Sequence, residues 1–308
     1  MRSVVFVAAV MAACSAGSTS GTEVSGKPKV AALSYPSWYL VKRIGALRVD
    51  ASLSVPDGTD PATWTPSGDE IGALSSADLI IMNGAGYEGW VATASLPESK
   101  LVDTAAGVEV LNVEGPAHHH GSDGAHAHRE PQPQVWADPS RYAQQARAVH
   151  QALVQADPAA KAAYDGQLQG VERQLTELSS GLDTQLAALG QRPLVASSPV
   201  FSYWSGRAGV TIKNENLDAA TAPSEERLAE LATAYPSGAV ILWSTPPSGV
   251  VASALPAFSH VSLSGLDQPK PGQAYDYVVA MRVNLEMMKR ASQEAASVDG
   301  TDGTDAPE

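Results

Sequence analysis

The stretch Pro158–Gly190 reads PAAKAAYDGQLQGVERQLTELSSGLDTQLAALG, and it decides how the rest of the chain can fold. Large apolar side chains recur in it every three or four residues, which is the spacing of one helix face. These residues are Tyr164, Leu168, Val171, Leu175, Leu178, Leu182, Leu186 and Leu189. Asp157 and Pro158 precede them as a predicted cap and first helical residue. At 1.5 Å per residue, about thirty residues make a helix about 45 Å long, so we expect it to span two lobes.

Short apolar runs alternate with helical segments on both sides of this helix. Before it we expect strands or strand–helix units at 29–39, 48–55, 79–82, Leu101 and 110–113, and a helix at 67–77. After it we expect strands at 194–197, 210–212, 239–243 and 261–263, and helices at 199–208, 224–234 and 275–295. This alternation is typical of parallel sheets covered on both faces. The predicted fold is therefore α/β, with two lobes that each hold a parallel β-sheet flanked by helices, joined by one long rigid helix.

The predicted domain limits follow from this pattern. A first lobe covers 29–138 and includes a loop at 117–129, a linking helical segment covers 139–190, and a second lobe covers 191–292. The remainder, 293–308, is acidic and rich in glycine, and we expect it to be disordered because it can bury little apolar surface.

The N-terminus has the composition of a secretory signal. A basic start precedes the apolar run VVFVAAVMAA, which is shorter than the about 20 residues that span a bilayer. The sequence MAAC at Met11–Cys14 is similar to a bacterial lipobox, which implies that Cys14 carries a lipid. The prediction is a signal peptide over 1–14 and a flexible tether over 15–28. Ordinary secretion with a free cysteine is the alternative.

Composition excludes several classes of protein. The net charge is −13, whereas a nucleic-acid-binding chain needs clustered Lys and Arg. Cys14 is the single cysteine, so an intramolecular disulfide and a thiolate metal site are impossible in the mature domain. The sequence shows no nucleophile–base pair, no Gly-rich phosphate loop and no paired carboxylates at a recognisable motif. We therefore expect a soluble extracytoplasmic protein that is not an enzyme.

Histidine is concentrated in one short segment, AHHHGSDGAHAH at 117–128. It holds five of the seven histidines of the chain, namely His118, His119, His120, His126 and His128. Small residues separate them, so the backbone can bring several imidazoles to one ion. Imidazole suits zinc, copper and nickel, and a His-rich tract indicates metal binding. The alternative is a solvated low-complexity loop, because the spacing is not that of a structural zinc site.

Five blocks in order resemble the bacterial ABC-transporter substrate-binding proteins that capture zinc or manganese, the ZnuA/TroA-like family. One block is the His-rich segment itself, which lies where zinc-specific members carry a His- and acid-rich loop. The other blocks are DPATWTPSGDEIGALSSADLIIMNGAGYEGW (60–90), QPQVWADP (132–139), VASSPVFSYWSGRAGV (195–210) and AYDYVVAMRVNLEMM (274–288). The resemblance covers about 29–292 and implies a metal site in the cleft between the lobes.

The resemblance also implies that the usual cleft ligands are substituted. The family holds its metal with three histidines and one carboxylate, or close variants. The histidine positions fall here on Ala62, Gln134 and Ser198, and the carboxylate position falls on Ser264 or, with a slipped alignment, on Asp267. Alanine has no donor, and a neutral amide or hydroxyl is a poor zinc ligand beside imidazole. We therefore predict a degenerate cleft site, with the His-rich segment as the principal metal-binding element.

Aromatic residues flank the substituted positions, and two roles are open to them. These residues are Trp64, Trp136, Tyr203 and Trp204. The favoured role is packing at the lobe interface. The other role is to line a cleft that binds a small organic ligand or a metal chelate, with Gln134 and Ser198 as hydrogen-bonding groups.

The functional prediction is an extracytoplasmic substrate-binding protein of a metal ABC importer. The resemblance implies zinc, with manganese as the second choice, and an ABC permease as the membrane partner. We expect a monomer that is periplasmic or membrane-anchored, contacts the membrane only through its lipid, and binds no nucleic acid. The alternative function is a non-metal binding module, or an adhesin-like surface lipoprotein, on the same fold.

Overall fold

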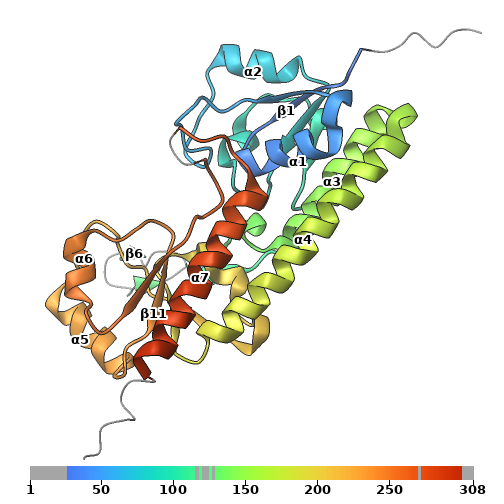
Figure 1. The fold of residues 1–308 in the computed structure, drawn as a ribbon. Helices are drawn as coiled ribbons and strands as arrows, with labels where there is room; N and C mark the ends of the chain where they lie inside the picture. The colour runs from blue at the N-terminus through green and yellow to red at the C-terminus, as the bar shows by residue number, and fades with distance from the viewer. Residues whose placement is uncertain (1–25, 115–117, 120–124, 127–128, 270–271, 300–308) are drawn as a thin grey trace, which may run out of the picture.

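Two four-stranded parallel sheets form the two lobes of the molecule (Figure 1). The computed structural model describes residues 26–114, 118–119, 125–126, 129–269 and 272–299. The first sheet has the order β2-β1-β3-β4 and the second β10-β9-β11-β12. Their strands are β1 (Lys29–Ala32), β2 (Asp50–Leu53), β3 (Leu79–Met82), β4 (Leu101–Asp103), β9 (Leu194–Ala196), β10 (Ile212–Asn214), β11 (Val240–Trp243) and β12 (Ser259–Ser262). The predicted α/β fold of two parallel sheets is confirmed.

Helices connect the strands and cross the junction of the lobes. They are α1 (Tyr35–Gly45), α2 (Gly68–Ser75), α3 (Pro139–Ala156), α4 (Lys161–Leu189), α5 (Glu225–Ala234), α6 (Gly249–Ala254) and α7 (Tyr277–Asp299). Several begin at the residues that the sequence indicates. Ser67 Oγ accepts a hydrogen bond from Glu70 N, and Glu70 Oε2 accepts one from Ser67 N, so α2 has a complete capping box. Ser224 caps α5 and Asp138 caps α3 in the same way through one side chain each.

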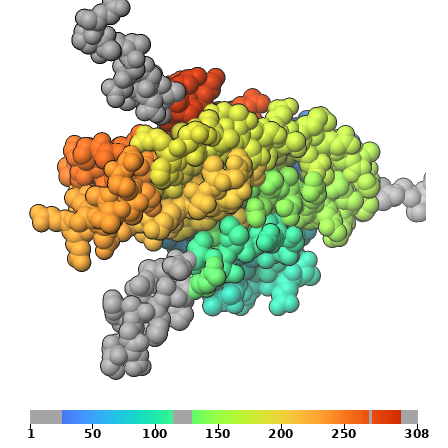
Figure 2. Space-filling view, turned by 90° about the horizontal axis from the view of Figure 1, so that it is seen from below, coloured from blue at the N-terminus to red at the C-terminus, as the bar shows by residue number. Residues whose placement is uncertain are grey.

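The helix α4 joins the lobes as expected, and it does not do so alone. Its 29 residues run along α3 on one side and α7 on the other, and Figure 2 shows this layer lying across both lobes. Its buried residues form one face, from Tyr164 to Leu189. One continuous hydrophobic core joins that face to apolar residues of both sheets, such as Ile81 and Leu242. The lobes are therefore held by shared core packing as well as by the helix.

Four local predictions are wrong in detail. The segment 199–208 is not an α-helix, since it forms 3-10 turns at Pro199–Trp204 and Arg207–Gly209. Residues 110–113 do not extend the parallel sheet. Instead β5 (Asn112–Glu114) pairs antiparallel with β8 (Arg129–Pro131). Asp157 makes no capping bond, because a 3-10 turn at Pro158–Ala160 precedes α4. Finally, α7 continues to Asp299, beyond the helix end expected at 295, and 300–308 lie outside the described residues.

The segment Gln132–Asp138 lies at the junction of the lobes and is hydrogen-bonded from every side. From the second lobe, Trp204 Nε1 donates to Ala137 O at 2.8 Å and Tyr203 OH donates to Gln132 O. From α7, Tyr277 OH donates to Trp136 O at 2.7 Å. In return Trp136 Nε1 donates to Gly265 O at 3.1 Å. These bonds satisfy the buried carbonyl groups of an irregular segment, so it can stay inside the protein.

An ion pair fixes the second lobe to the start of α3. Arg207 Nη1 lies 2.9 Å from Asp138 Oδ1, and the Asp138 side chain is 1% exposed. The same guanidinium donates to Asp183 and to Ser179 on α4. Arg141 provides a second cation, 3.0 Å from Asp138 Oδ2. Because Asp138 is buried, the loss of a partner is costlier here than on the surface.

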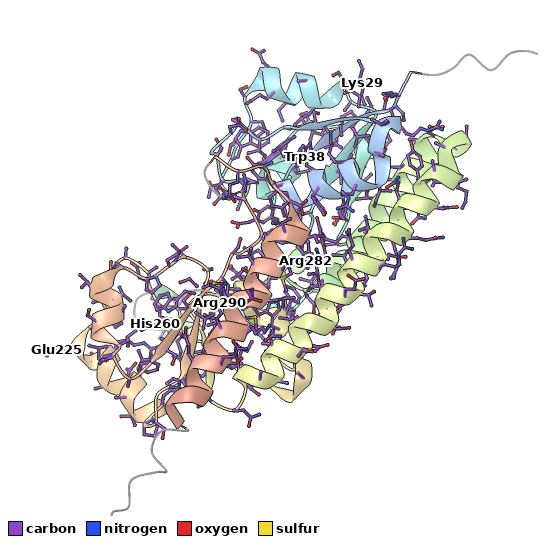
Figure 3. The ribbon with its side chains drawn as sticks, in the orientation of Figure 1. Lys29, Trp38, Glu225, His260, Arg282 and Arg290 are labelled. Carbon is purple, nitrogen blue, oxygen red and sulfur yellow. The ribbon has the colours of Figure 1, made fainter. Side chains whose placement is uncertain are left out.

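We predict that Arg207→Met lowers the free energy of unfolding by about 2–3 kcal/mol, because a buried carboxylate loses one of its two cations. The matched control is Arg290→Met on α7 (Figure 3), whose pair with Glu286 joins side chains that are 64% and 52% exposed. That control should cost at most about 1 kcal/mol. Urea unfolding measures both variants. Equal losses would contradict the role given to Arg207.

His260 is a second buried group whose charge matters for stability. Trp243 Nε1 donates to His260 Nδ1 at 3.0 Å, and the two rings stack with centroids 6.0 Å apart. Its Nε2 is buried without a hydrogen-bond partner among the described residues. Burial lowers the pKa of His260 below its ordinary value of 6.5. Protonation at Nδ1 would place a donor against the donor of Trp243.

Stability should therefore fall as the pH drops below about 6.5, where the unfolded chain binds a proton at His260 and the native chain does not. The loss is up to about 1.4 kcal/mol per pH unit until the native pKa is reached. His260→Asn keeps an acceptor for Trp243 and cannot titrate. Urea unfolding of parent and variant between about pH 5 and pH 8 measures how the free energy of unfolding changes with pH. We expect this change to be smaller for the variant. Parallel slopes would exclude His260 as the titrating group.

Candidate functional site

A cavity of about 540 Å³ lies between the lobes, beside the β5–β8 ribbon. It brings together two of the substituted family positions, Gln134 and Ser198. Its other lining residues are Val113, Glu130, Pro131, Gln132, Pro133, Pro199, Val200 and Asn216. Ser198 follows β9 at its carboxyl end, which is where ligands bind in open parallel sheets. This cavity is the candidate site of the cleft.

The polar side chains that line this cavity beside its valines and prolines are, with one exception, neutral amides and a hydroxyl. Ser198 Oγ lies 3.0 Å from the Oγ of Ser244, which follows β11 in the same way as Ser198 follows β9. Gln134 donates its backbone N–H to Gln132 Oε1 at 3.4 Å. Among the described residues that line the cavity, Glu130 alone carries a charge. The set therefore offers weak ligands for zinc and good hydrogen-bonding groups for a polar molecule.

Ala62, the third substituted position, does not line this cavity. It lies exposed in the loop between β2 and α2, and its N–H donates to Asp60 Oδ1 at 2.9 Å. Asp60 O accepts from Trp64 N in the same turn, at 2.9 Å. Ala62 is therefore a turn residue, and its side chain has no group that can bind a metal.

Asp267 is a stronger candidate than Ser264 for the carboxylate position that the resemblance implies. Ser264 is used by its own loop, because its Oγ accepts from Leu266 N and its backbone pairs twice with the Asn284 side chain. Burial raises the pKa of Asp267, and the negative charge of Asp60 in the first lobe raises it further. Burial, followed by the charges of Asp267 and Asp60, also raises the pKa of the Tyr87 hydroxyl. The negative charges of Asp60 and Asp267 therefore both act on the Tyr87 hydroxyl.

The aromatic residues that flank these positions pack rather than line the cavity, which corrects the cleft-lining role. Trp136 and Trp204 have 0% exposure and Tyr203 has 2%. Trp64 is also buried and packs edge-on against Trp90, with ring centroids 5.4 Å apart. The Trp136 and Trp204 indoles donate to backbone carbonyls across the lobe junction. Large rings that must satisfy an N–H while buried have no surface left for a ligand.

A buried polar network supports the site segment from the first lobe. Asn83, at the end of β3, donates to Pro133 O at 2.8 Å, immediately before Gln134. Gln145 on α3 donates to Asn83 Oδ1 at 2.8 Å. The carboxylate of Glu88 accepts from Asn83 N and Gly84 N at 2.8 and 3.1 Å. Burial raises the pKa of Glu88 to about 7. The Asn-Gly-x-Gly-x-Glu block thus orients the chain that carries Gln134.

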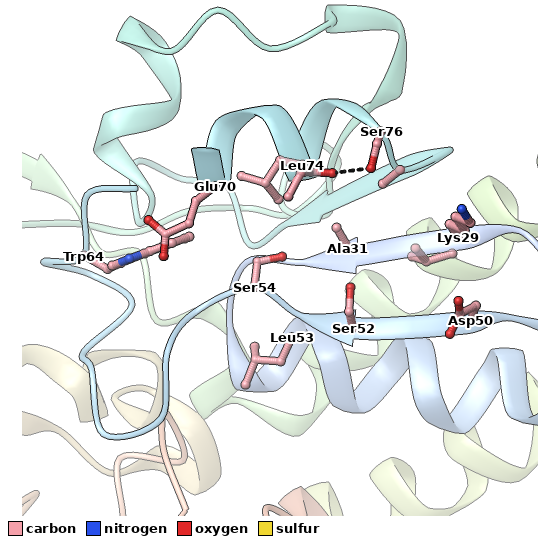
Figure 4. A pocket seen from close by; sticks show the side chains of 13 residues that line it. Lys29, Ala31, Asp50, Ser52, Leu53, Ser54, Trp64, Glu70, Leu74 and Ser76 are labelled. Carbon is pink, nitrogen blue, oxygen red and sulfur yellow. Dashed lines mark hydrogen bonds between the residues drawn. The ribbon is translucent and has the colours of Figure 1, made fainter. Parts of the chain in front are cut away.

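A second cavity, of about 290 Å³, lies within the first lobe beside α2 (Figure 4). Its polar lining includes Ser52, Ser54 and Glu70, and Trp64 closes one end. The Glu70 carboxylate is occupied by the capping box of α2, since it accepts from both Ser67 N and Ser67 Oγ. The Glu70 carboxylate therefore already serves the helix, and the cavity is not assigned a ligand.

The histidines of the His-rich segment fall partly within the described chain. His118 and His119 form β6 (His118–His119), and His126 belongs to β7 (Ala125–His126). His120, His128 and Cys14 lie outside the described residues, as do the signal peptide and most of the tether. Among the residues that the structure describes, no three His, Cys, Asp or Glu side chains gather as a metal cluster. In that same part of the chain, no helix is long and apolar enough to cross a membrane.

Sequence reasoning missed Asn216, Ser244 and Glu130. The signal was available for Ser244, because a polar residue follows the apolar run VILW at 240–243. It was weaker for Asn216, which lies two residues past β10 with a φ of 49°. Glu130 could not be placed, since its position depends on the antiparallel pairing of β5 with β8.

Comparisons with known proteins place this chain in a family. Residues 30–291 match the family model described as "Zinc-uptake complex component A periplasmic", ZnuA. The high-affinity zinc uptake system protein ZnuA of Bacillus subtilis strain 168 is 23% identical over 301 residues, which cover 91% of this chain and 93% of that protein. A metal ABC transporter substrate-binding lipoprotein of Streptococcus parasanguinis, FimA, is 28% identical over 209 residues, 64% of each chain.

Solved structures share the fold. The metal-dependent lipoprotein YcdH of Bacillus subtilis superposes with a TM-score of 0.72 at 21% identity, over 86% of this chain and 98% of that chain. The Zn(II)-bound ZnuA-like domain of Streptococcus pneumoniae AdcA gives 0.71 at 20% identity, over 87% and 99%. The family consists of transporter components that bind a substrate and are not enzymes. Because the family model matches most of its length, this chain belongs to the ZnuA family of zinc-uptake substrate-binding proteins.

Proposed function

We propose that this protein captures zinc outside the cytoplasm for an ABC importer, and that the His-rich segment is its principal metal-binding element. The observation that carries the proposal is the family match over residues 30–291, in a chain whose cleft positions hold Ala62, Gln134 and Ser198. The relatives named above are zinc or metal proteins, which favours a metal cargo over a non-metal binding module. Manganese is the second choice, and a solved neighbour, FpvC of Pseudomonas aeruginosa, is described in complex with Mn²⁺.

The chemistry of the two candidate sites supports the His-rich segment over the cleft. Imidazole nitrogen is a preferred zinc ligand, whereas neutral amide and hydroxyl oxygens neither bind zinc well nor offset its charge. The described cleft residues supply Gln134, Ser198 and at most the carboxylates Asp267 and Glu130. The segment 117–128 supplies five imidazoles. Imidazoles from one short segment should bind zinc less tightly than a closed four-ligand cage, which suits release to a permease.

The remaining parts of the proposal concern place and partner. The family implies an ABC permease as the membrane partner. A lipid on Cys14 would hold the protein at the membrane through the tether 15–28, and we propose that the protein works there as a monomer. FimA, a lipoprotein, supports an anchored form.

Deletion of residues 117–129 should abolish most zinc binding by the chain, because it removes all five clustered imidazoles. Gln134→Ala is the matched cleft variant and should bind zinc as the parent does. Isothermal titration with zinc, together with elemental analysis, measures both. If the deletion variant binds as tightly as the parent, the cleft is the principal site. If the parent binds no zinc at micromolar concentrations, the metal function itself is wrong.

Zinc affinity should decrease as the pH falls through about 6.5, because protons compete for the imidazole nitrogens. Zinc titrations between about pH 5.5 and pH 8 should show the steepest change in affinity near about pH 6.5. A carboxylate site would instead keep its affinity until about pH 4–5. A flat profile above pH 5 (about the carboxylate range) would therefore point to acids such as Asp267.

A further inference from the structure

The interlobe cavity is much larger than a bare metal ion needs. Its volume is about 540 Å³, within the range of about 300–1,000 Å³ that is usual for small-molecule sites. A zinc ion holds its ligands at about 2.0–2.2 Å, so a site for the bare ion draws its donors together around one point. Here Gln134 and Ser198 line a space whose walls also include the apolar residues Val113, Pro133 and Val200. The cavity therefore has the size and the mixed lining of a site for an organic molecule.

Several polar groups in this lining have no partner of their own. Gln132 is 2% exposed, and its Oε1 accepts from Gln134 N at 3.4 Å. In the part of the chain that the structure describes, neither the Nε2 group of Gln132 nor the side-chain amide of Gln134 has a hydrogen-bond partner. Asn216 Oδ1 accepts from Asn214 Nδ2 at 2.8 Å, which leaves the Nδ2 group of Asn216 as a donor. Buried polar groups are normally paired, so these groups indicate a ligand that completes their hydrogen bonds.

The charge of the lining limits the ligand further. Glu130 is exposed and forms no ion pair with the rest of the described chain. Among the described residues that line the cavity there is no Lys, Arg or His. A carboxylate or phosphate group inside it would meet only neutral partners and the negative charge of Glu130, so the cost of its desolvation would not be offset. The cavity is therefore suited to a neutral or cationic molecule.

We propose that this cavity binds a zinc ion already enclosed by a small organic chelator, in a complex without net negative charge. The inference rests on the proposed metal function of the chain. The chelator supplies the nitrogen and oxygen ligands that Ala62, Gln134 and Ser198 do not supply. Gln134, Ser198 and Asn216 hydrogen-bond the outer groups of the chelator, and the prolines and valines of the lining contact its carbon atoms. In this arrangement free zinc binds the His-rich segment and chelated zinc binds the cavity.

An exchange-inert metal complex tests the cavity without involving the His-rich segment. The cobalt(III) complex of two histidines carries a single positive charge, and its metal does not exchange, so the imidazoles of the protein cannot take the ion. The cobalt(III) complex of ethylenediaminetetraacetate is equally inert and carries a single negative charge. Calorimetric titration of the full chain at millimolar concentrations should show binding of the cationic complex and none of the anionic complex. Free histidine should bind more weakly than the cationic complex, because no metal neutralises its carboxylate.

Variants of the lining locate the bound complex. Gln134→Leu and Ser198→Ala remove hydrogen-bonding groups without adding bulk, and each should weaken binding of the cationic complex by about three- to tenfold. Glu130→Gln removes the one charge and should weaken binding by a similar factor, with the larger effect at low salt. Gln151→Leu is the matched control, because Gln151 is exposed on α3 and does not line the cavity. This control should leave the affinity unchanged.

The outcomes separate this inference from the function beneath it. If the chain binds neither complex, or if the three lining variants bind the cationic complex as tightly as the parent does, the inference is overturned. It is also overturned if the anionic complex or free histidine binds as tightly as the cationic complex.

Titration with free zinc is a separate readout. If zinc binds and deletion of 117–129 abolishes the binding, the proposed function stands whatever the cobalt complexes do. If no zinc binds while the cationic complex does, the capture of free zinc is wrong and the cavity site remains.

Discussion

The structure depends on the burial of one irregular segment, Gln132–Asp138, between the two lobes. It contains one 3-10 turn, Val135–Ala137, and several of its carbonyl groups accept from side chains that reach them from elsewhere. Asn83 donates from the first lobe, Trp204 from the second lobe and Tyr277 from α7. Asp138 at its end pairs with Arg207. One short stretch therefore sets the position of both sheets relative to the central helices.

This constraint shapes what the cleft can do. The aromatic side chains near this segment pack inside the lobe junction, and the polar side chains that line the cavity are Gln132, Gln134, Ser198, Asn216 and Glu130. Amide and hydroxyl groups form hydrogen bonds well and hold zinc poorly. The scaffold of the ZnuA family is thus combined with a cavity whose polar groups are, apart from Glu130, neutral.

The sequence predicted a secondary-structure element correctly where its local residues favour only one structure. The helix predicted at 67–77 is α2, whose first turn is closed by a capping box of Ser67 and Glu70. The α-helix predicted at 199–208 is wrong, because apolar residues at helical spacing also suit a buried 3-10 turn. The prediction that 110–113 belongs to the parallel sheet is wrong, because apolar character does not distinguish parallel from antiparallel pairing. Both errors concern tertiary neighbours that no local window contains.

The sequence alone determined the α/β class and the long connecting helix, because periodicity is a local property. It also located the His-rich segment, which is a matter of composition. Only the tertiary structure decided that Gln134 and Ser198 share a cavity while Ala62 does not. It alone set the antiparallel register in which His118 is opposite His126. Those relations join residues far apart in the chain or depend on strand register, and distance and register exist only once the chain has packed.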